Sequence, residues 1–180
     1  MYILTGPVHS GKTTLLKNIL SSLEEKDLSI DGYLSEANWK GEEFIGYDLY
    51  DLRNRQYFPF IRKKGQEDWQ RIGSFYFLPE TLDRAQRIIH RCKNTDLCIV
   101  DEVGPLELKE KGVWPALKDV LKIPEQNMLL VLRKSILKDF MRKMQRDDLV
   151  LFDIDKNKTP ALLAESLLRN IEKKRESVSK

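Results

Sequence analysis

The residue types with the clearest chemistry lie in one glycine-rich run, Gly6-Pro7-Val8-His9-Ser10-Gly11-Lys12-Thr13-Thr14. Its two glycines let the backbone turn tightly, so that successive N–H groups can point at one anion. Lys12 would add a positive charge for the β- and γ-phosphates of a nucleotide, and the Thr13 hydroxyl would bind Mg²⁺. The pattern G-x-x-x-x-G-K-[ST] is met at every fixed position. We therefore predict that residues 6–14 bind nucleotide and that Lys12 also takes part in catalysis.

The residues on either side of this run predict the elements that such a loop needs. A short apolar segment, residues 2–4, is typical of a buried strand. After the loop, leucine and isoleucine recur at helical spacing as far as Leu23. The start of that helix would aim its free N–H groups and its positive dipole end at the anion. A chance match on an ordinary glycine turn is the alternative, and the flanking elements disfavour it.

A second pair of chemically capable residues follows the apolar run Leu97-Cys98-Ile99-Val100. A buried strand here would deliver Asp101 to the carboxyl edge of a parallel sheet, where phosphates bind. We predict that Asp101 holds Mg²⁺ together with Thr13. Glu102 has the chemistry to orient and deprotonate a water that attacks the γ-phosphate. The alternative for Glu102 is a carboxylate at a strand end that merely faces solvent.

Length and composition bound the protein class. We expect 180 residues to form one domain, residues 1–180, and a net charge of +3 does not by itself favour nucleic-acid binding. No apolar run approaches the roughly 20 residues of a membrane helix. Met1 precedes the first predicted strand directly, so we expect no signal peptide. The two cysteines form no C-x-x-C pair, which favours a reduced, cytoplasmic protein.

The segment after the first helix predicts an antiparallel β insertion at about residues 30–62, within a β-rich region that extends to residue 78. Strands at 30–39, 44–52 and 57–61 are joined by turns too short for a helix. Most of the aromatic residues of the chain lie here, between Tyr33 and Phe77. Aromatic faces can stack on nucleobases, but aromatic cross-strand pairs also stabilise small sheets. We favour the structural interpretation.

The remaining apolar strands alternate with helices, which predicts an α/β fold with a mostly parallel sheet covered on both faces. In proteins with such a phosphate loop and a catalytic Glu beside the metal Asp, a further strand separates the two motif strands. The only candidate is 128–132, so we expect it between residues 2–5 and 97–101. Arg133 would then emerge near the triphosphate; the alternative is that it points to solvent.

The stretch Asp101-Glu102-Val103-Gly104-Pro105-Leu106-Glu107-Leu108 resembles the Asp-Glu-Ile-Gly-x-Met-Glu-Leu signature of the thermophile-type, or cancer-related, nucleoside-triphosphatases. The resemblance spans nearly the whole chain. It implies a P-loop NTPase fold and Mg²⁺-dependent hydrolysis of ATP, GTP and other nucleoside triphosphates to diphosphate and phosphate. The chain differs from the expected family pattern near its end: it has Asn157-Lys158 where we expect members of the family to have an Asn-Arg pair. Lysine keeps the charge but loses the planar fork of arginine.

Within the same stretch, Glu107 falls after Gly104-Pro105, which end the strand. We favour a structural role for Glu107.

Two other functions are compatible with the motifs. In a small-molecule kinase, the basic helix at 136–144 would close as a lid and the aromatic insertion would hold an acceptor. Glu102 argues against this, because a base that activates water would waste the triphosphate. A nucleotide-dependent module that binds nucleic acid would use the basic stretch 133–146, whose acidic residues partly offset its charge. The nucleoside triphosphate is the partner we expect, and the sequence indicates no particular protein partner.

Overall fold

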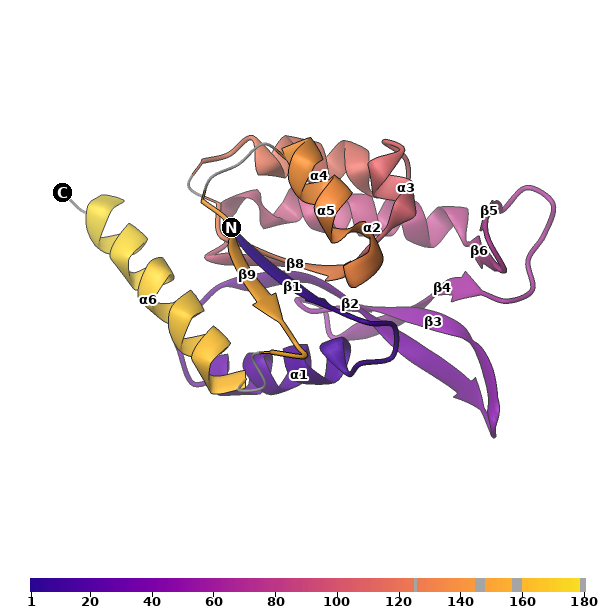
Figure 1. The fold of residues 1–180 in the computed structure, drawn as a ribbon, viewed down its shortest axis with the longest axis horizontal. Coiled ribbons are helices and arrows are strands. Elements are labelled where there is room, and N and C mark those ends of the chain that lie inside the picture. Colours follow the sequence, from indigo (N-terminus) through magenta and orange to yellow (C-terminus); the bar gives the residue numbers. More distant parts are fainter. Residues whose placement is uncertain (125, 145–147, 157–159, 179–180) are drawn as a thin grey trace.

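The α/β fold expected from the sequence is confirmed by a computed structural model, which describes residues 1–124, 126–144, 148–156 and 160–178. Within these residues, nine strands form one continuous sheet in the order β5-β6-β4-β3-β2-β7-β8-β1-β9. Helices cover both faces of the sheet (Figure 1). The sheet therefore forms the central layer, and its parallel half and antiparallel half have different roles.

The parallel half of the sheet carries the two motif strands. Its members are β2 (Ile30–Lys40), β7 (Leu97–Val103), β8 (Met128–Arg133), β1 (Tyr2–Gly6) and β9 (Val150–Asp153), and each pairs in parallel with the next. The middle strands are mostly apolar because helices bury them on both sides, and their polar residues lie towards the carboxyl ends. The predicted position of β8 between β1 and β7 is confirmed. All five strands thus present their carboxyl ends at one edge.

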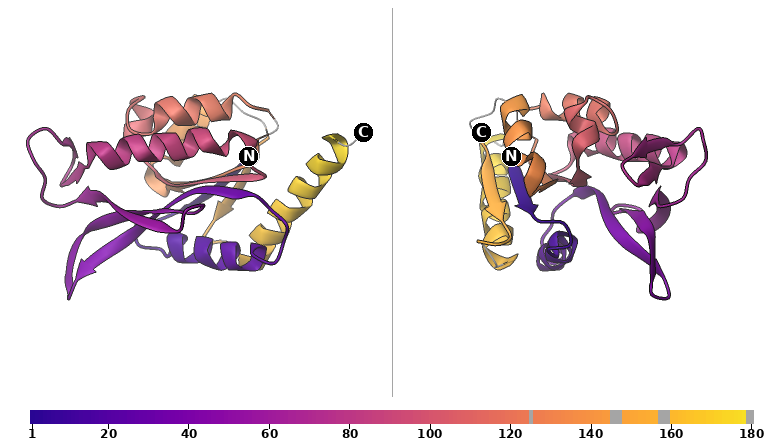
Figure 2. Two further views of the ribbon diagram at one scale, coloured as in Figure 1. Left: turned by 180° about the vertical axis from the view of Figure 1, so that it is seen from behind. Right: turned by 45° about the vertical axis from the view of Figure 1, so that its right-hand side comes forward.

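The antiparallel half confirms the β insertion that we expected at about residues 30–62, and it is continuous with the parallel half. Strand β2 belongs to both halves: Ile30–Tyr33 pairs in parallel with β7, and Tyr33–Lys40 pairs antiparallel with β3. The insertion is therefore part of the main sheet. The change from parallel to antiparallel pairing takes place within β2. Its further strands are β3 (Glu43–Asp51), β4 (Gln56–Arg62), β5 (Gln70–Ile72) and β6 (Phe75–Phe77). Figure 2 shows the β2–β3 hairpin projecting beyond the helices.

The aromatic residues of the insertion include pairs that face each other across neighbouring strands. Trp39 lies opposite Phe44 with ring centroids 5.1 Å apart, and Tyr50 lies opposite Tyr57 at 4.6 Å. Such pairs stabilise antiparallel strands by roughly 0.2–1 kcal/mol each. The structural interpretation of these aromatic residues therefore holds for the hairpin, although other rings of the insertion line a cavity.

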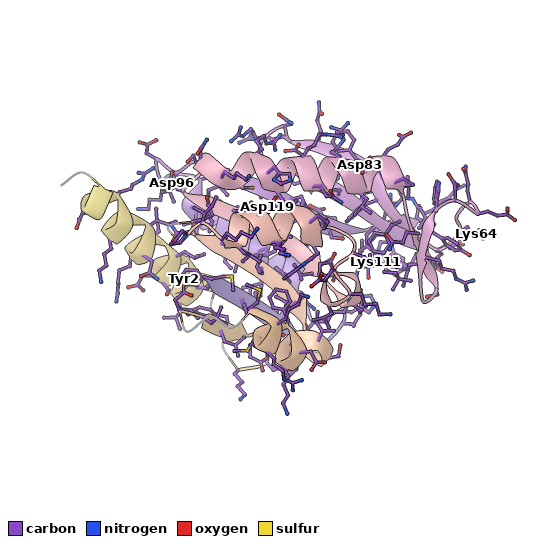
Figure 3. The ribbon with its side chains drawn as sticks, turned by 90° about the horizontal axis from the view of Figure 1, so that it is seen from above. Tyr2, Lys64, Asp83, Asp96, Lys111 and Asp119 are labelled. Atoms are coloured by element: carbon purple, nitrogen blue, oxygen red, sulfur yellow. The ribbon has the colours of Figure 1, made fainter. Side chains whose placement is uncertain are left out.

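Each face of the sheet has its own hydrophobic core. On one face lie α2 (Pro79–Arg91), α3 (Pro105–Leu108), α4 (Trp114–Leu121) and α5 (Leu137–Met144), and on the other lie α1 (Lys12–Leu23) and α6 (Pro160–Val178) (Figure 1). Single-turn 3₁₀ helices at Cys92–Asn94 and Lys134–Ile136 join helix to strand. Polar residues such as Asp83 and Asp119 lie on the outer side of α2 and α4 (Figure 3).

Helix α5 is fixed in the core, which weakens the idea that it closes as a lid. Phe140 is fully buried and makes an edge-on ring contact with Trp114, with centroids 6.5 Å apart. Lys143, on the same helix, pairs with Glu110 at 2.8 Å and lies over the Trp114 ring. Among the described helices, none is long and apolar enough to span a membrane.

Candidate active site

The predicted phosphate loop connects β1 to α1 in the strand–loop–helix arrangement that the sequence indicates. Gly11 has a φ of +86°, in the left-handed region that favours glycine. A Cβ added at Gly6 would clash with the side chains of Ile154 and Ser10, so a larger residue would require both to move. Pro7, Val8 and His9 are exposed in the loop.

Lys12 begins α1 and folds its side chain over the loop. Its ammonium donates hydrogen bonds to the carbonyl oxygens of Pro7 at 2.6 Å and Gly6 at 3.5 Å. The residue is only 6% exposed. Burial lowers the pKa of Lys12, and the nearby charges of Glu102 and Asp101 oppose that shift. A cation is thus held at the loop, close to both acidic residues of the second motif.

Asp101 is buried at the carboxyl end of β7, against the start of α1. Its Oδ2 accepts hydrogen bonds from the Thr13 hydroxyl and the Ser35 backbone N–H, both at 3.0 Å. Its Oδ1 has no hydrogen-bond partner among the residues that the structure describes. Burial, followed by the charge of Glu102, raises the pKa of Asp101 to about 7. A buried carboxylate with one open oxygen is costly unless it is paired or binds a cation.

Glu102 adopts a backbone conformation that sequence patterns did not reveal. Its φ is +65°, and the register between β7 and β8 shifts by one residue between Val100 and Val103, which marks a β-bulge. Bulges and left-handed non-glycine residues concentrate at active sites, where they redirect a side chain. Here Oε2 of Glu102 accepts two hydrogen bonds from Arg133, one from Nη2 at 3.1 Å and one from Nε at 3.2 Å.

Arg133 therefore lies where the predicted strand order would put it. It is the last residue of β8 and stands opposite Gly6 in the sheet register. Its side chain, about one-third exposed, pairs with Glu102 instead of pointing freely into solvent. The structure thus gathers Lys12, Thr13, Asp101, Glu102 and Arg133 at one edge of the sheet.

A cavity of about 340 Å³ opens beside this cluster. Its lining joins the phosphate loop to the insertion, so a ligand there would touch both. No local sequence pattern indicated that residues of the insertion line this cavity, because they reach the loop only through the long β2–β3 pairing. The lining comprises residues 8–14, Lys17, Ser35, Glu36, Ala37, Tyr47 and Glu102.

Comparison with known proteins agrees with this geometry. A family model described as NTPase matches residues 1–168. The chain belongs to this family. "Nucleoside-triphosphatase THEP1" of Methanopyrus kandleri is 32% identical over 117 residues, 64% of each chain, and that of Thermotoga maritima is 26% identical over 168 residues, 92% of each chain. The predicted family is therefore confirmed.

Solved structures show the same fold. The solution structure of a human cancer-related nucleoside triphosphatase superposes with a TM-score of 0.71 at 22% identity, covering 93% of this chain and 95% of that one. The crystal structure of THEP1 from Aquifex aeolicus gives a TM-score of 0.68 at 22% identity, covering 85% and 89%. In this member of the NTPase family, the nine-stranded sheet and its helices thus follow a known arrangement.

Two further sequence predictions for this NTPase concern Glu107 and the pair Asn157-Lys158. The Glu107 carboxylate is 95% buried and accepts from the N–H groups of Gly104 at 2.8 Å and Val113 at 3.1 Å, so it braces the loop after β7. This agrees with the structural role expected for it. The departure from the family pattern at Asn157-Lys158 lies outside the described residues.

Proposed function

We propose that the protein hydrolyses nucleoside triphosphates to diphosphates and inorganic phosphate in a Mg²⁺-dependent reaction, with Glu102 as general base. The observation that carries this proposal is the convergence of a phosphate loop, a buried acid with an open oxygen and a second acid at one edge of the sheet, where the loop and the second acid line one cavity and the buried acid accepts a hydrogen bond from Thr13. Phosphoryl transfer needs little beyond positioning and charge neutralisation, so these parts suffice.

The phosphate loop would bind the triphosphate. The N–H groups at the start of α1 and the helix dipole favour an anion at this point. Lys12 already carries its charge to the loop and exchanges carbonyl partners for phosphate oxygens when substrate enters. The Gly6 and Gly11 positions leave no Cβ between backbone and phosphate. The remaining loop residues from Pro7 to Thr14 shape the site around these groups.

Thr13 and Asp101 are the residues that would hold Mg²⁺. Their oxygens lie 3.0 Å apart, and the open Oδ1 of Asp101 is an oxygen ligand of the kind that hard cations prefer. When bound, the ion would neutralise charge on the phosphate oxygens. Arg133 and Lys12 add two fixed positive charges on the protein side.

Glu102 would accept the proton of the attacking water. As the water oxygen forms its bond to the γ-phosphorus, its proton passes to the Glu102 carboxylate and the bond to the β-phosphate oxygen breaks. Arg133 holds Oε2 of Glu102, which fixes the direction of the carboxylate. The same guanidinium can approach the γ-phosphate and offset its charge. The bulge at Glu102 supports this role, because it turns the side chain toward the phosphate-loop cavity.

The proposal is tested by phosphate release from ATP, GTP, CTP and UTP, with and without Mg²⁺. We expect release that depends on Mg²⁺ and on Lys12. Calorimetry on Lys12→Ala should show that most triphosphate affinity is lost, whereas Lys26→Ala, at the far end of the α1 region, should bind as the wild type does. Unchanged ATP affinity in Lys12→Ala would mean that the loop is not the nucleotide site.

No observation favours nucleic acid as the partner. The described cations in the basic stretch are largely paired: Lys134 with Asp153 and Asp155 at 3.1 and 3.0 Å, and Lys143 with Glu110. A salt-dependent electrophoretic shift would contradict this assignment. The partner that the site supports is the nucleoside triphosphate.

A further inference from the structure

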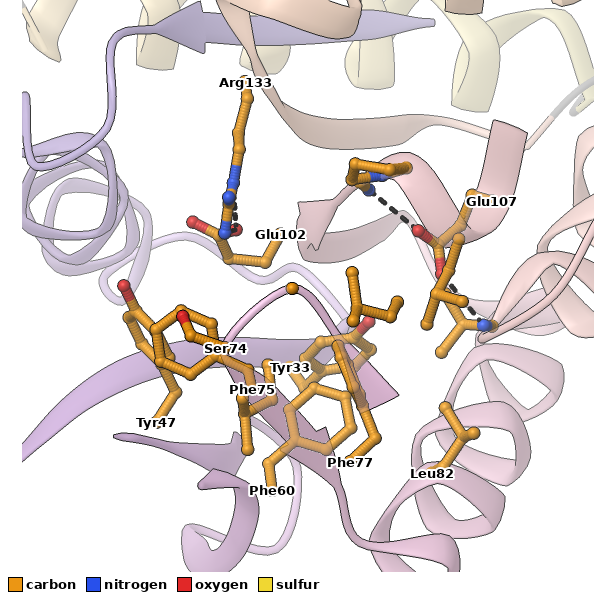
Figure 4. Close-up of a pocket in the computed structure, with 17 residues that line it drawn as sticks. Tyr33, Tyr47, Phe60, Ser74, Phe75, Phe77, Leu82, Glu102, Glu107 and Arg133 are labelled. Atoms are coloured by element: carbon orange, nitrogen blue, oxygen red, sulfur yellow. Dashed lines mark hydrogen bonds and ion pairs between the residues drawn. The ribbon is translucent and has the colours of Figure 1, made fainter. Parts of the chain in front are cut away.

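A second cavity, of about 280 Å³, lies on the other side of Glu102 from the phosphate loop (Figure 4). Glu102 and Tyr47 line both cavities. The walls are otherwise mainly aromatic and aliphatic, and they come from the insertion, from α2 and from the loop after β7. The rings that line this aromatic cavity are Tyr33, Tyr47, Phe60, Phe75 and Phe77.

The rings of the aromatic cavity support one another. Tyr33 meets Phe60 edge-on at 6.0 Å between centroids, and Phe60 meets Phe77 in the same way at 5.5 Å. Both pairings are favourable orientations for aromatic side chains and fix the shape of the wall. A preformed wall of ring faces and edges suits a flat aromatic occupant.

The charged groups of the aromatic cavity are few, and each of them is engaged. Both carboxylate oxygens of Glu107 accept backbone hydrogen bonds, and Glu102 is neutralised by Arg133. A net charge on the occupant would therefore meet no free counter-charge from these groups. The cavity favours an uncharged molecule, because burial of an unpaired charge is costly.

Tyr33 contributes an uncharged polar group to this wall. The residue is 1% exposed, yet its hydroxyl makes no hydrogen bond to another residue that the structure describes. Burial and the charge of Glu107 raise its pKa well above the ordinary value, so the hydroxyl stays protonated. Its ring forms part of the cavity wall (Figure 4). An occupant with a hydrogen-bond acceptor would satisfy this buried donor.

We propose that the aromatic cavity binds a small, planar, uncharged aromatic molecule that accepts a hydrogen bond from Tyr33, and that this occupant lowers hydrolysis. An engineered apolar cavity of about 150 Å³ binds benzene, so the larger volume here has room for one or two fused rings. The predicted effect on hydrolysis rests on the proposed role of Glu102, whereas the predicted binding is independent of that role.

The expected kinetic effect follows from the position of Glu102 between the two cavities. An occupant covers the side of Glu102 and Arg133 that faces the aromatic cavity, and it excludes water there. The phosphate loop, with Lys12 and Thr13, lines only the other cavity. The occupant should therefore lower kcat and leave the KM for the triphosphate unchanged.

The binding test uses quinoline and naphthalene, which have the same shape but differ in one ring nitrogen that can accept a hydrogen bond. Calorimetry should show that both bind. Tyr33→Phe should weaken quinoline about fivefold, the worth of one hydrogen bond, and leave naphthalene unchanged. Tyr57→Phe, an exposed tyrosine of the same sheet, is the matched control and should alter neither affinity. Ser74→Trp, at the exposed rim, should abolish the binding of both.

The kinetic test measures Mg²⁺-dependent phosphate release at saturating quinoline. We expect kcat to fall at least about threefold with an unchanged KM. Failure of either probe to bind, or equal quinoline affinity in wild type and Tyr33→Phe, would overturn the site. A raised KM would place quinoline in the nucleotide site, and an unchanged kcat would overturn the effect on hydrolysis. Phosphate release without quinoline tests the proposed function separately.

Discussion

Two buried aspartates on neighbouring strands, Asp31 of β2 and Asp101 of β7, have opposite surroundings. Asp31 is fully buried, and each of its oxygens is paired: Arg91 donates to both, Gly32 N–H donates to Oδ1 at 2.7 Å, and Arg53 lies 2.9 Å from Oδ2. Asp101 is equally buried but keeps one oxygen open. A buried carboxylate that is fully paired holds structure together, whereas one left open is ready for a ligand.

The difference extends to the surroundings of each aspartate. Arg91 also pairs with Asp51 at 2.7 Å, so one arginine of α2 joins β2 to β3. The hydrogen bonds that Arg91 donates to Asp31 and Asp51 raise the pKa of Arg91 despite its partial burial. At Asp101 the neighbour is a second acid, Glu102, which pairs with Arg133 at 3.1 Å. The first cluster should matter for stability, and the second for catalysis.

The largest effect should come from Glu102→Gln, which keeps the size of the side chain and removes the base. Turnover should fall about 10²–10⁴-fold, the usual worth of a positioned general base, with triphosphate affinity retained. Phosphate release and calorimetry on the same preparation measure the two effects. Glu110→Gln, at an exposed position with a similar positive φ, is the control and should turn over normally. Wild-type turnover in Glu102→Gln would remove Glu102 from the mechanism and favour a kinase.

Arg91→Ala should have the opposite profile. It leaves Asp31 and Asp51 buried with their main cation gone, and breaking such a buried pair costs roughly 3 kcal/mol or more of unfolding free energy. Turnover of the folded variant should stay near wild type, because the cluster does not line the phosphate cavity. Denaturant unfolding measures the loss. Arg87→Ala, exposed on the same helix, should cost little. Equal unfolding free energies for Arg91→Ala and Arg87→Ala would show that the Asp31 cluster does not have the structural role assigned to it.

Asp101→Asn tests the other half of the comparison. The amide can still accept from Thr13 and Ser35 but loses the charge that would attract Mg²⁺. The Mg²⁺ concentration that gives half-maximal phosphate release should rise about tenfold, which corresponds to roughly 1.4 kcal/mol. In the absence of nucleotide and Mg²⁺, the melting temperature should not fall. A large loss of stability would mean that Asp101 is a structural acid like Asp31.

The sequence was sufficient for features that depend on local pattern. The phosphate loop and the buried strand that carries Asp101 follow from spacing and hydrophobic runs, and the place of β8 follows from likeness to other proteins with both motifs. The bulge at Glu102 was missed, because Val100 and Val103 reveal their one-residue register shift only against β8. The Asp31–Arg91 pair joins residues 60 apart in the chain, and no local pattern encodes such a contact.

The division of the sheet was also beyond the sequence. The period-two pattern correctly indicated strands in the insertion, but it could not show that one strand serves two neighbours. Strand β2 changes partner at Tyr33, from β7 to β3. That change brings the Ser35 backbone N–H onto Asp101 and Tyr47 to the phosphate cavity. The contribution of the insertion to the site therefore became visible only with the tertiary structure.

The smallest expected effect concerns Asp96, a third acid that is fully paired but lies near the surface (Figure 3). Arg175 of α6 donates to both of its oxygens at 2.9 and 2.7 Å, and Ser29 donates twice to Oδ2. Burial raises the pKa of Asp96, but the hydrogen bonds from Arg175 and Ser29 outweigh burial and lower it to about 2. Asp96 thus ties α6 to the sheet.

Arg175→Ala should therefore destabilise the protein only slightly at pH 7, since solvent weakens an ion pair whose arginine is exposed. Because the pKa of Asp96 is lower in the folded state than in the unfolded state, its contribution is present above about pH 4 and is lost as the pH falls towards 2. Urea unfolding of wild type and Arg175→Ala should differ at pH 7 and converge near pH 2. Arg169→Ala, whose i,i+4 pair with Glu165 is largely exposed, is the control and should change the unfolding free energy less. A difference that persists at pH 2 would show that Arg175 acts through packing and not through Asp96.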